Sequence, residues 1–155
     1  GIYSKKIKSL AELKDGDSVA IPNDPTNGGR ALLLLQAQGV LKLREGAGLK
    51  ATPLDIAENP KNLRIIELDA AQLPRSLDDT AASAVNTNYA VEAGLDPVKD
   101  PIAREAAESP YANVIAVRKV DADAPWAKTL VEAYHDQKIK DWINDQYKGA
   151  LVVAW

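Results

Sequence analysis

The sequence contains no cysteine, no methionine and no phenylalanine, and it has a single histidine. Without cysteine there can be no disulfide bond, thiolate nucleophile or zinc–thiolate site, and the sequence does not indicate whether the protein works in an oxidising or a reducing compartment. The apolar runs fall short of the roughly 20 residues that a membrane-spanning helix needs, and the first ten residues are too polar for a signal peptide. Because even residue 1 is not methionine, we expect a processed, truncated or engineered chain.

The chain also has no excess of positive charge. The 19 lysine and arginine residues are outnumbered by 22 aspartate and glutamate residues, which gives a net charge of −3 at pH 7. No basic stripe with interleaved aromatic residues is present, so we expect no nucleic-acid partner. What the chain does have is 155 residues, 46% of them hydrophobic, and that is enough for one ordinary domain with a sizeable core.

Strand-like and helix-like segments alternate along most of the chain, and this rhythm predicts an α/β fold with a mainly parallel sheet. The predicted strands lie at 17–21, 63–68, 82–85 and 112–118. The first predicted helix covers 29–37 with Asn27 as its N-cap, and the second begins at Pro53 and ends by residue 58. Further helices are predicted at 72–77, in a segment that ends at Gly94, at 125–135 and at 137–147.

The stretch IPNDPTNGGRALLLL (21–35) places a single arginine, Arg30, in the first turn of a predicted helix. A helix N-terminus already carries about half a positive charge, so we expect an anion beside Arg30. No acidic residue lies within one turn on that helix, and Asp24 is the nearest one across the loop. The loop matches neither the P-loop nor GxGxxG, which disfavours a nucleotide.

Two interpretations of Arg30 remain open from the local pattern. In the first, its guanidinium forks onto a planar carboxylate, and the N–H groups of the helix N-terminus add to the field. In the second, the two glycines supply positive φ angles for a turn and Arg30 is simply solvated.

The stretch AVNTNYA (84–90) places Asn86 and Asn88 just beyond the carboxyl end of a predicted buried strand. In open α/β sheets, ligands bind at that edge. An asparagine amide can donate to a carboxylate and accept from an ammonium at the same time. Either residue can instead be the N-cap of the following helix, and for Asn88 the cap is a sufficient explanation.

The sequence gives no sign of a catalytic set. His135, the only histidine, lies near the end of an amphipathic segment without a nucleophile or second metal ligand beside it. Asp78 and Asp79 are adjacent in a predicted loop, where neighbouring side chains splay apart. We therefore expect no enzyme activity, no cofactor and no metal site.

Four stretches carry a resemblance to a known family: IPNDPTNGGRALLLL, LPRSLDD (73–79), AVNTNYA and SPYANVIAVR (109–118). Together they resemble the methionine-binding lipoprotein family of bacterial ABC importers, and the resemblance covers essentially the whole chain as the later part of a family member. It implies one lobe of a type II periplasmic binding protein, with a mainly parallel or mixed sheet flanked by helices. Residues 1–113 would form the second lobe, and 114–155 would form a crossover strand and helices that pack on a first lobe absent here.

The resemblance also implies a function. Such a receptor captures L- or D-methionine in a cleft between lobes and delivers it to a membrane permease, from the periplasm or the outer face of the cytoplasmic membrane, lipid-anchored in the full-length protein. Arg30 would grip the α-carboxylate, Asn27 and Asn86 would contact or frame the head group, and Asn88 is a further candidate. The alternative is a half-receptor that serves as a structural module without significant ligand binding. In either case, a chain without its first lobe is expected to self-associate or to rearrange its tail.

Overall fold

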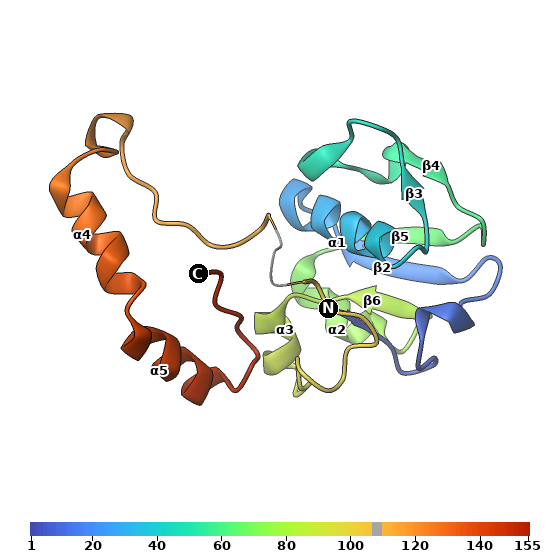
Figure 1. Ribbon diagram of the computed structural model, residues 1–155. Coiled ribbons are helices and arrows are strands. Elements are labelled where there is room, and N and C mark those ends of the chain that lie inside the picture. Colours follow the sequence, from blue (N-terminus) through green and yellow to red (C-terminus); the bar gives the residue numbers. More distant parts are fainter. Residues whose placement is uncertain (107–109) are drawn as a thin grey trace. The chain divides into compact units, whose positions relative to one another are not determined.

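The computed structural model describes residues 1–106 and 110–155, and the chain divides into two compact units, Gly1–Glu105 and Ala106–Trp155 (Figure 1). The sequence-based boundary after residue 113 therefore falls inside the second unit. The assignment of the two parts to a second lobe and a return segment stays a prediction.

The first unit is built on a four-stranded sheet in the order β1-β6-β2-β5. The central strand β2 runs parallel to both β5 and β6, and β1 runs antiparallel to β6, so the sheet is mixed. A small antiparallel sheet joins β3 and β4. The strands are β1 (Ile2–Tyr3), β2 (Ser18–Pro22), β3 (Lys42–Leu43), β4 (Ile56–Glu58), β5 (Arg64–Leu68) and β6 (Ala82–Ala84).

Helices cover both faces of this sheet (Figure 1). Successive strand residues point to opposite faces: Val19 and Ile21 of β2 join the core on the side of α1 (Pro25–Ala37), whereas Ala20 joins the core on the side of α2 and α3. These two helices span Leu73–Ser76 and Thr87–Glu92. Short 3-10 helices lie at Leu10–Glu12, Gly48–Lys50, Pro53–Asp55 and Ala70–Gln72.

Helix α1 begins four residues earlier than the sequence predicted. Its N-cap is Asp24, whose carboxylate accepts a hydrogen bond from the Asn27 backbone N–H at 2.9 Å. The prediction of Asn27 as the N-cap is wrong because Pro25 suits the first helical position, with its fixed φ and missing N–H, and Asp24 is an equally good cap. With about 3.6 residues per turn, Arg30 lies in the second turn of α1, not in the first.

The two glycines of the motif lie inside α1 and do not form a turn. Neither has a positive φ, so the turn interpretation is wrong. A Cβ on Gly28 would lie 2.8 Å from the Pro22 carbonyl oxygen, and one on Gly29 would lie 2.7 Å from the Leu49 carbonyl oxygen. Both glycines are therefore required by the close approach of α1 to neighbouring backbone.

Tertiary pairing overrides local propensity after residue 52. The predicted start is present, since Asp55 accepts from the Thr52 backbone N–H at 2.8 Å and from its hydroxyl at 2.9 Å. The helix, however, is a single 3-10 turn, and Ile56 then pairs with Leu43 in the β3–β4 sheet. The prediction of a helix up to residue 58 is therefore wrong.

The predicted strand at 112–118 is also wrong: these residues form no strand. An apolar, β-branched segment becomes a strand only where a neighbouring strand is hydrogen-bonded to it, and within the described ranges 112–118 enters no β-ladder.

The second unit contains the two predicted helices, α4 (Pro125–Tyr134) and α5 (Gln137–Tyr147), after a 3-10 turn at Lys119–Asp121. Large apolar side chains on both helices are exposed: 53% for Trp126 and 55% for Trp142. None of the helices in the described parts of the chain combines the length and the apolar character that crossing a membrane requires.

Candidate functional site

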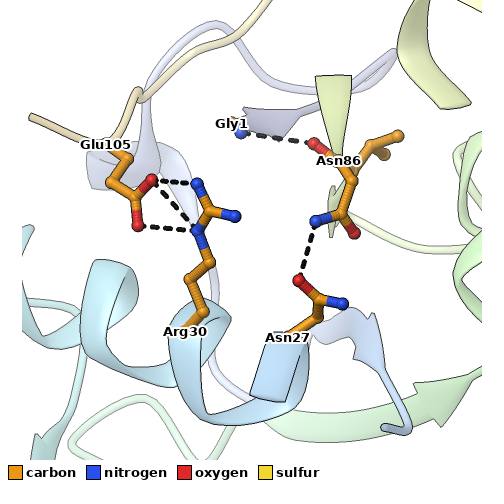
Figure 2. Close-up of polar contacts among 6 residues, drawn as sticks. Gly1, Asn27, Arg30, Asn86 and Glu105 are labelled. Carbon is orange, nitrogen blue, oxygen red and sulfur yellow. Dashed lines mark hydrogen bonds and ion pairs between the residues drawn. The ribbon is translucent and has the colours of Figure 1, made fainter. Parts of the chain in front are cut away.

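The carboxyl ends of β2 and β6 meet at one edge of the sheet, because these strands are parallel neighbours with Val19 opposite Ala82. The segment after β2 carries Asn27, and Asn86 follows β6 by two residues. The fold therefore brings together two asparagines that are 59 residues apart, and Asn86 Nδ2 donates a hydrogen bond to Asn27 Oδ1 at 3.0 Å (Figure 2). The strand positions pointed to this edge, but nothing in the sequence indicated the direct contact.

Asn27 is held from its other side by Asp24. Its Nδ2 donates to both carboxylate oxygens of Asp24, at 3.2 and 3.0 Å, in addition to the backbone bond that caps the helix. Burial alone would raise the pKa of Asp24, but the hydrogen bonds that its carboxylate accepts, those from Asn27 foremost, together hold this pKa below its ordinary value of 3.8. Asp24 is therefore a carboxylate at neutral pH and can only accept hydrogen bonds.

Arg30 is paired with Glu105, which approaches it from the end of the first unit (Figure 2). Arg30 Nε donates to Oε1 at 2.8 Å and to Oε2 at 3.0 Å, and Nη2 also donates to Oε2. The side chains stay partly accessible, 36% for Arg30 and 23% for Glu105. From the sequence, the anion beside Arg30 is expected to come from a ligand. Glu105 could not be predicted as its partner, because 75 residues separate the two and no local pattern links them.

Asn86 occupies the N-cap position of α3, as one interpretation predicted, but its side chain makes no capping bond. Its amide is turned to Asn27, and Oδ1 is buried without a hydrogen-bond partner among the residues described here. Asn88 lies inside α3 with an exposed side chain, so its predicted role as a cap is wrong. Asn88 does not join the Asn27–Asn86 pair, and a ligand contact for it stays a prediction.

These groups suit recognition of a polar head group. The guanidinium offers donors only and fits a planar carboxylate side-on, whereas the two amides offer both donors and acceptors. Over the described ranges 1–106 and 110–155, no group of three or more histidine, cysteine, aspartate or glutamate side chains is placed to hold a metal ion. The arrangement can bind and orient a small zwitterion at the sheet edge.

Solved structures with the same fold include a bacterial nutrient-binding protein and a bacterial lipoprotein. A nutrient-binding protein from Burkholderia cenocepacia bound to methionine is 58% identical with a TM-score of 0.85, covering all of this chain and 66% of that one. A lipoprotein from Enterococcus faecalis V583 is 38% identical with a TM-score of 0.90, covering all of this chain and 65% of that one. The α/β fold class inferred from the sequence is confirmed.

The whole chain, residues 1–155, matches the family described as NlpA lipoprotein, and it belongs to that family. "D-methionine-binding lipoprotein MetQ" of Salmonella typhimurium is 54% identical over 155 residues, which is 99% of this chain and 57% of the relative. "Outer membrane lipoprotein 3" of Mannheimia haemolytica is 53% identical over 153 residues, covering 99% and 58%. The resemblance inferred from the motifs is confirmed, and the chain spans a little over half the length of these relatives.

Proposed function

We propose that this chain is the head-group-binding part of a methionine receptor that serves an ABC importer. Relatives named as methionine-binding proteins and a similar structure bound to methionine support the ligand. The observation that carries the proposal is the Arg30–Glu105 fork, in which the guanidinium already holds a carboxylate side-on at the sheet edge. An α-carboxylate has the same planar shape and charge as that of Glu105.

In this proposal the α-carboxylate of the ligand binds Arg30 in place of Glu105, and Asn27 and Asn86 frame the rest of the head group. The exchange replaces one carboxylate by another, so the partly buried guanidinium keeps an anionic partner throughout. Asn88, exposed on α3, is a further candidate for a ligand contact.

The rest of the receptor is proposed to supply what this chain lacks. A first lobe preceding residue 1 would close over the ligand by a hinge motion and enclose the thioether side chain. Residues 1–113 would be the second lobe, and 114–155 would pack on the first. The receptor would be lipid-anchored at the outer face of the cytoplasmic membrane or in the periplasm and would deliver methionine to a permease. We call the protein with both lobes the two-lobed form.

Calorimetric titration with L- and D-methionine tests the proposal in both this chain and the two-lobed form. We expect weak binding by this chain, on the order of millimolar, because it would form only one wall of the proposed cleft. In the two-lobed form we expect binding several orders of magnitude tighter. The absence of heat with either enantiomer in the two-lobed form would overturn the proposal. It would leave the alternative, a structural module without significant ligand binding.

A further inference from the structure

Asp24 begins a chain of three side chains that ends at Asn86. Its carboxylate accepts from the Asn27 backbone N–H and from Asn27 Nδ2. Asn27 Oδ1 in turn accepts from Asn86 Nδ2 at 3.0 Å, which Figure 2 shows as a contact between α1 and the segment that follows β6. The carboxylate of Asp24 is thus connected to the Asn86 amide through a single intervening amide.

The direction of these hydrogen bonds is forced by chemistry. A carboxylate has no hydrogen to donate, so Asn27 must turn its NH2 group to Asp24 and its oxygen to Asn86. Asn86 must then turn its own NH2 group to Asn27. Because an amide has one nitrogen and one oxygen, the same contact fixes where Asn86 Oδ1 lies.

The surroundings of Asn86 Oδ1 support the inference that the bond to Asn27 sets the orientation of the Asn86 amide. This atom is buried and has no hydrogen-bond partner in the described part of the chain. An unpaired buried acceptor is costly, so the amide has not been oriented by partners of its own oxygen. Its orientation follows from the bond to Asn27, and through Asn27 from Asp24.

We propose that Asp24 is a positioning residue for the ligand head group: through Asn27 it fixes which end of the Asn86 amide each part of that head group meets. This inference rests on the proposed function, in which Asn86 frames the head group. A carboxylate can pair only with the amide nitrogen, and an ammonium only with the amide oxygen. A reversed Asn86 amide therefore presents the wrong atom to either group.

The substitution Asp24→Asn is designed to reverse the amides while keeping the helix cap. Asparagine is as good an N-cap as aspartate, so its oxygen still accepts from the Asn27 backbone N–H. Its NH2 group then faces the NH2 group of Asn27. The contact that Asn27 Nδ2 makes with the second carboxylate oxygen, the shorter of its two at 3.0 Å, thereby becomes a contact between two donors. We expect Asn27 to turn over to offer its oxygen there, and Asn86 to turn over in response.

The double variant Asp24→Asn with Asn27→Asp restores the original direction. The NH2 group introduced at position 24 donates to the carboxylate introduced at position 27. That carboxylate again accepts from Asn86 Nδ2, so Asn86 keeps its wild-type orientation. The net charge also equals that of the wild type, which separates the orientation of Asn86 from a simple loss of charge.

Methionine affinity in the two-lobed form is measured by calorimetry for the wild type, Asp24→Asn and the control Asp69→Asn. Asp69 is an exposed aspartate that also caps a helix, accepting from the Ala71 N–H at 2.9 Å, but it is not connected to Asn86. We expect Asp24→Asn to weaken binding about tenfold or more and the control to be unchanged. The double variant also alters Asn27, which is proposed to frame the head group, so it is tested by the orientation of Asn86 and not by its affinity. Wild-type affinity in Asp24→Asn would overturn the proposal.

The side-chain amide NMR signals of Asn27 and Asn86 provide a readout that needs no ligand. In this chain, Asp24→Asn should shift the Nδ2 proton signals of both residues, and the double variant should return the Asn86 signals to their wild-type positions. Unchanged Asn86 signals in Asp24→Asn would overturn the proposal even if binding changed. If the wild-type two-lobed form did not bind methionine, the proposed function would be overturned instead. The amide signals would still decide whether Asp24 orients Asn86.

Discussion

The Glu105 carboxylate pairs with the Arg30 guanidinium, and Arg30 Nε lies 2.8 and 3.0 Å from the two carboxylate oxygens. The proposed α-carboxylate would bind the same guanidinium. The first unit thus already contains a carboxylate of its own at the place assigned to the ligand, and in the proposed function ligand binding would be an exchange between two carboxylates.

Glu105→Gln is expected to tighten methionine binding. Glutamine keeps the shape of the side chain, but its neutral amide accepts a weaker hydrogen bond than a carboxylate, by about 1 kcal/mol, so it competes less well for Arg30. We expect roughly a fivefold gain in affinity in the two-lobed form, measured by calorimetry. The control is Glu67→Gln, which removes one negative charge from the exposed surface of β5. A weaker complex in Glu105→Gln would mean that Glu105 orients Arg30 for the ligand.

Gly29→Ala is expected to destabilise the first unit although alanine is the better helix former. The new Cβ would lie 2.7 Å from the Leu49 carbonyl oxygen and 3.1 Å from that of Ala51, and both are backbone atoms. Overpacking of this kind costs about 1–3 kcal/mol, which exceeds the gain of about 1 kcal/mol in helix propensity. Urea unfolding with an unchanged slope measures the difference, and Gly28→Ala should change stability in the same direction. A more stable Gly29→Ala protein would contradict the close packing of α1.

The stability contribution of Asp24 is expected to depend on pH. Its hydrogen bonds from Asn27 hold the folded-state pKa below the ordinary value of 3.8, although burial opposes them. A depressed pKa contributes stability that is fully present above the unfolded-state value and is lost as the pH falls through the folded-state value. The difference in free energy of unfolding between the wild type and Asp24→Asn should therefore be constant above about pH 5 and shrink at lower pH. A difference that widens on acidification would contradict this assignment.

Elements with a strong local pattern could be predicted from the sequence. Strands β2 and β5 and helices α4 and α5 were located within a residue or two, because apolar alternation, helical periodicity and flanking breakers all agreed. Two failures had a tertiary cause: Ile56 joins β4 because Leu43 offers a partner, and 112–118 enters no ladder in the described chain.

The site was predictable in part. The strand pattern placed Asn86 at this edge of the sheet, and the motif singled out Arg30. Asn27 was a site candidate only through the family resemblance, and the fold brings the two asparagines into contact. Glu105 was missed because a partner 75 residues away leaves no trace in local sequence. The role of Asp24 as the N-cap of α1 could not be predicted from the sequence, because Asn27 is also an adequate N-cap and fits a later start of the helix.

The second unit is expected to drive self-association of this chain. Trp126 and Trp142 are more than half exposed on α4 and α5, and further exposed apolar side chains accompany them; exposed apolar patches favour association. Sedimentation velocity over a range of concentrations should show oligomers that Trp126→Ser with Trp142→Ser abolishes. Lys138→Ser, on the exposed surface of α5, is the control. A wild-type chain that stays monomeric at every concentration would contradict the expectation.

The assignment of Arg30 to the ligand carboxylate is tested most directly by titrating methionine into the wild type and Arg30→Ala, each in the two-lobed form. Charge-assisted hydrogen bonds contribute about 1.5–3 kcal/mol each, so removing a guanidinium that makes two of them should weaken binding by about 100-fold or more. Arg64→Ala, which removes an exposed arginine of β5, should leave the affinity unchanged. Equal affinities for the wild type and Arg30→Ala would contradict the account.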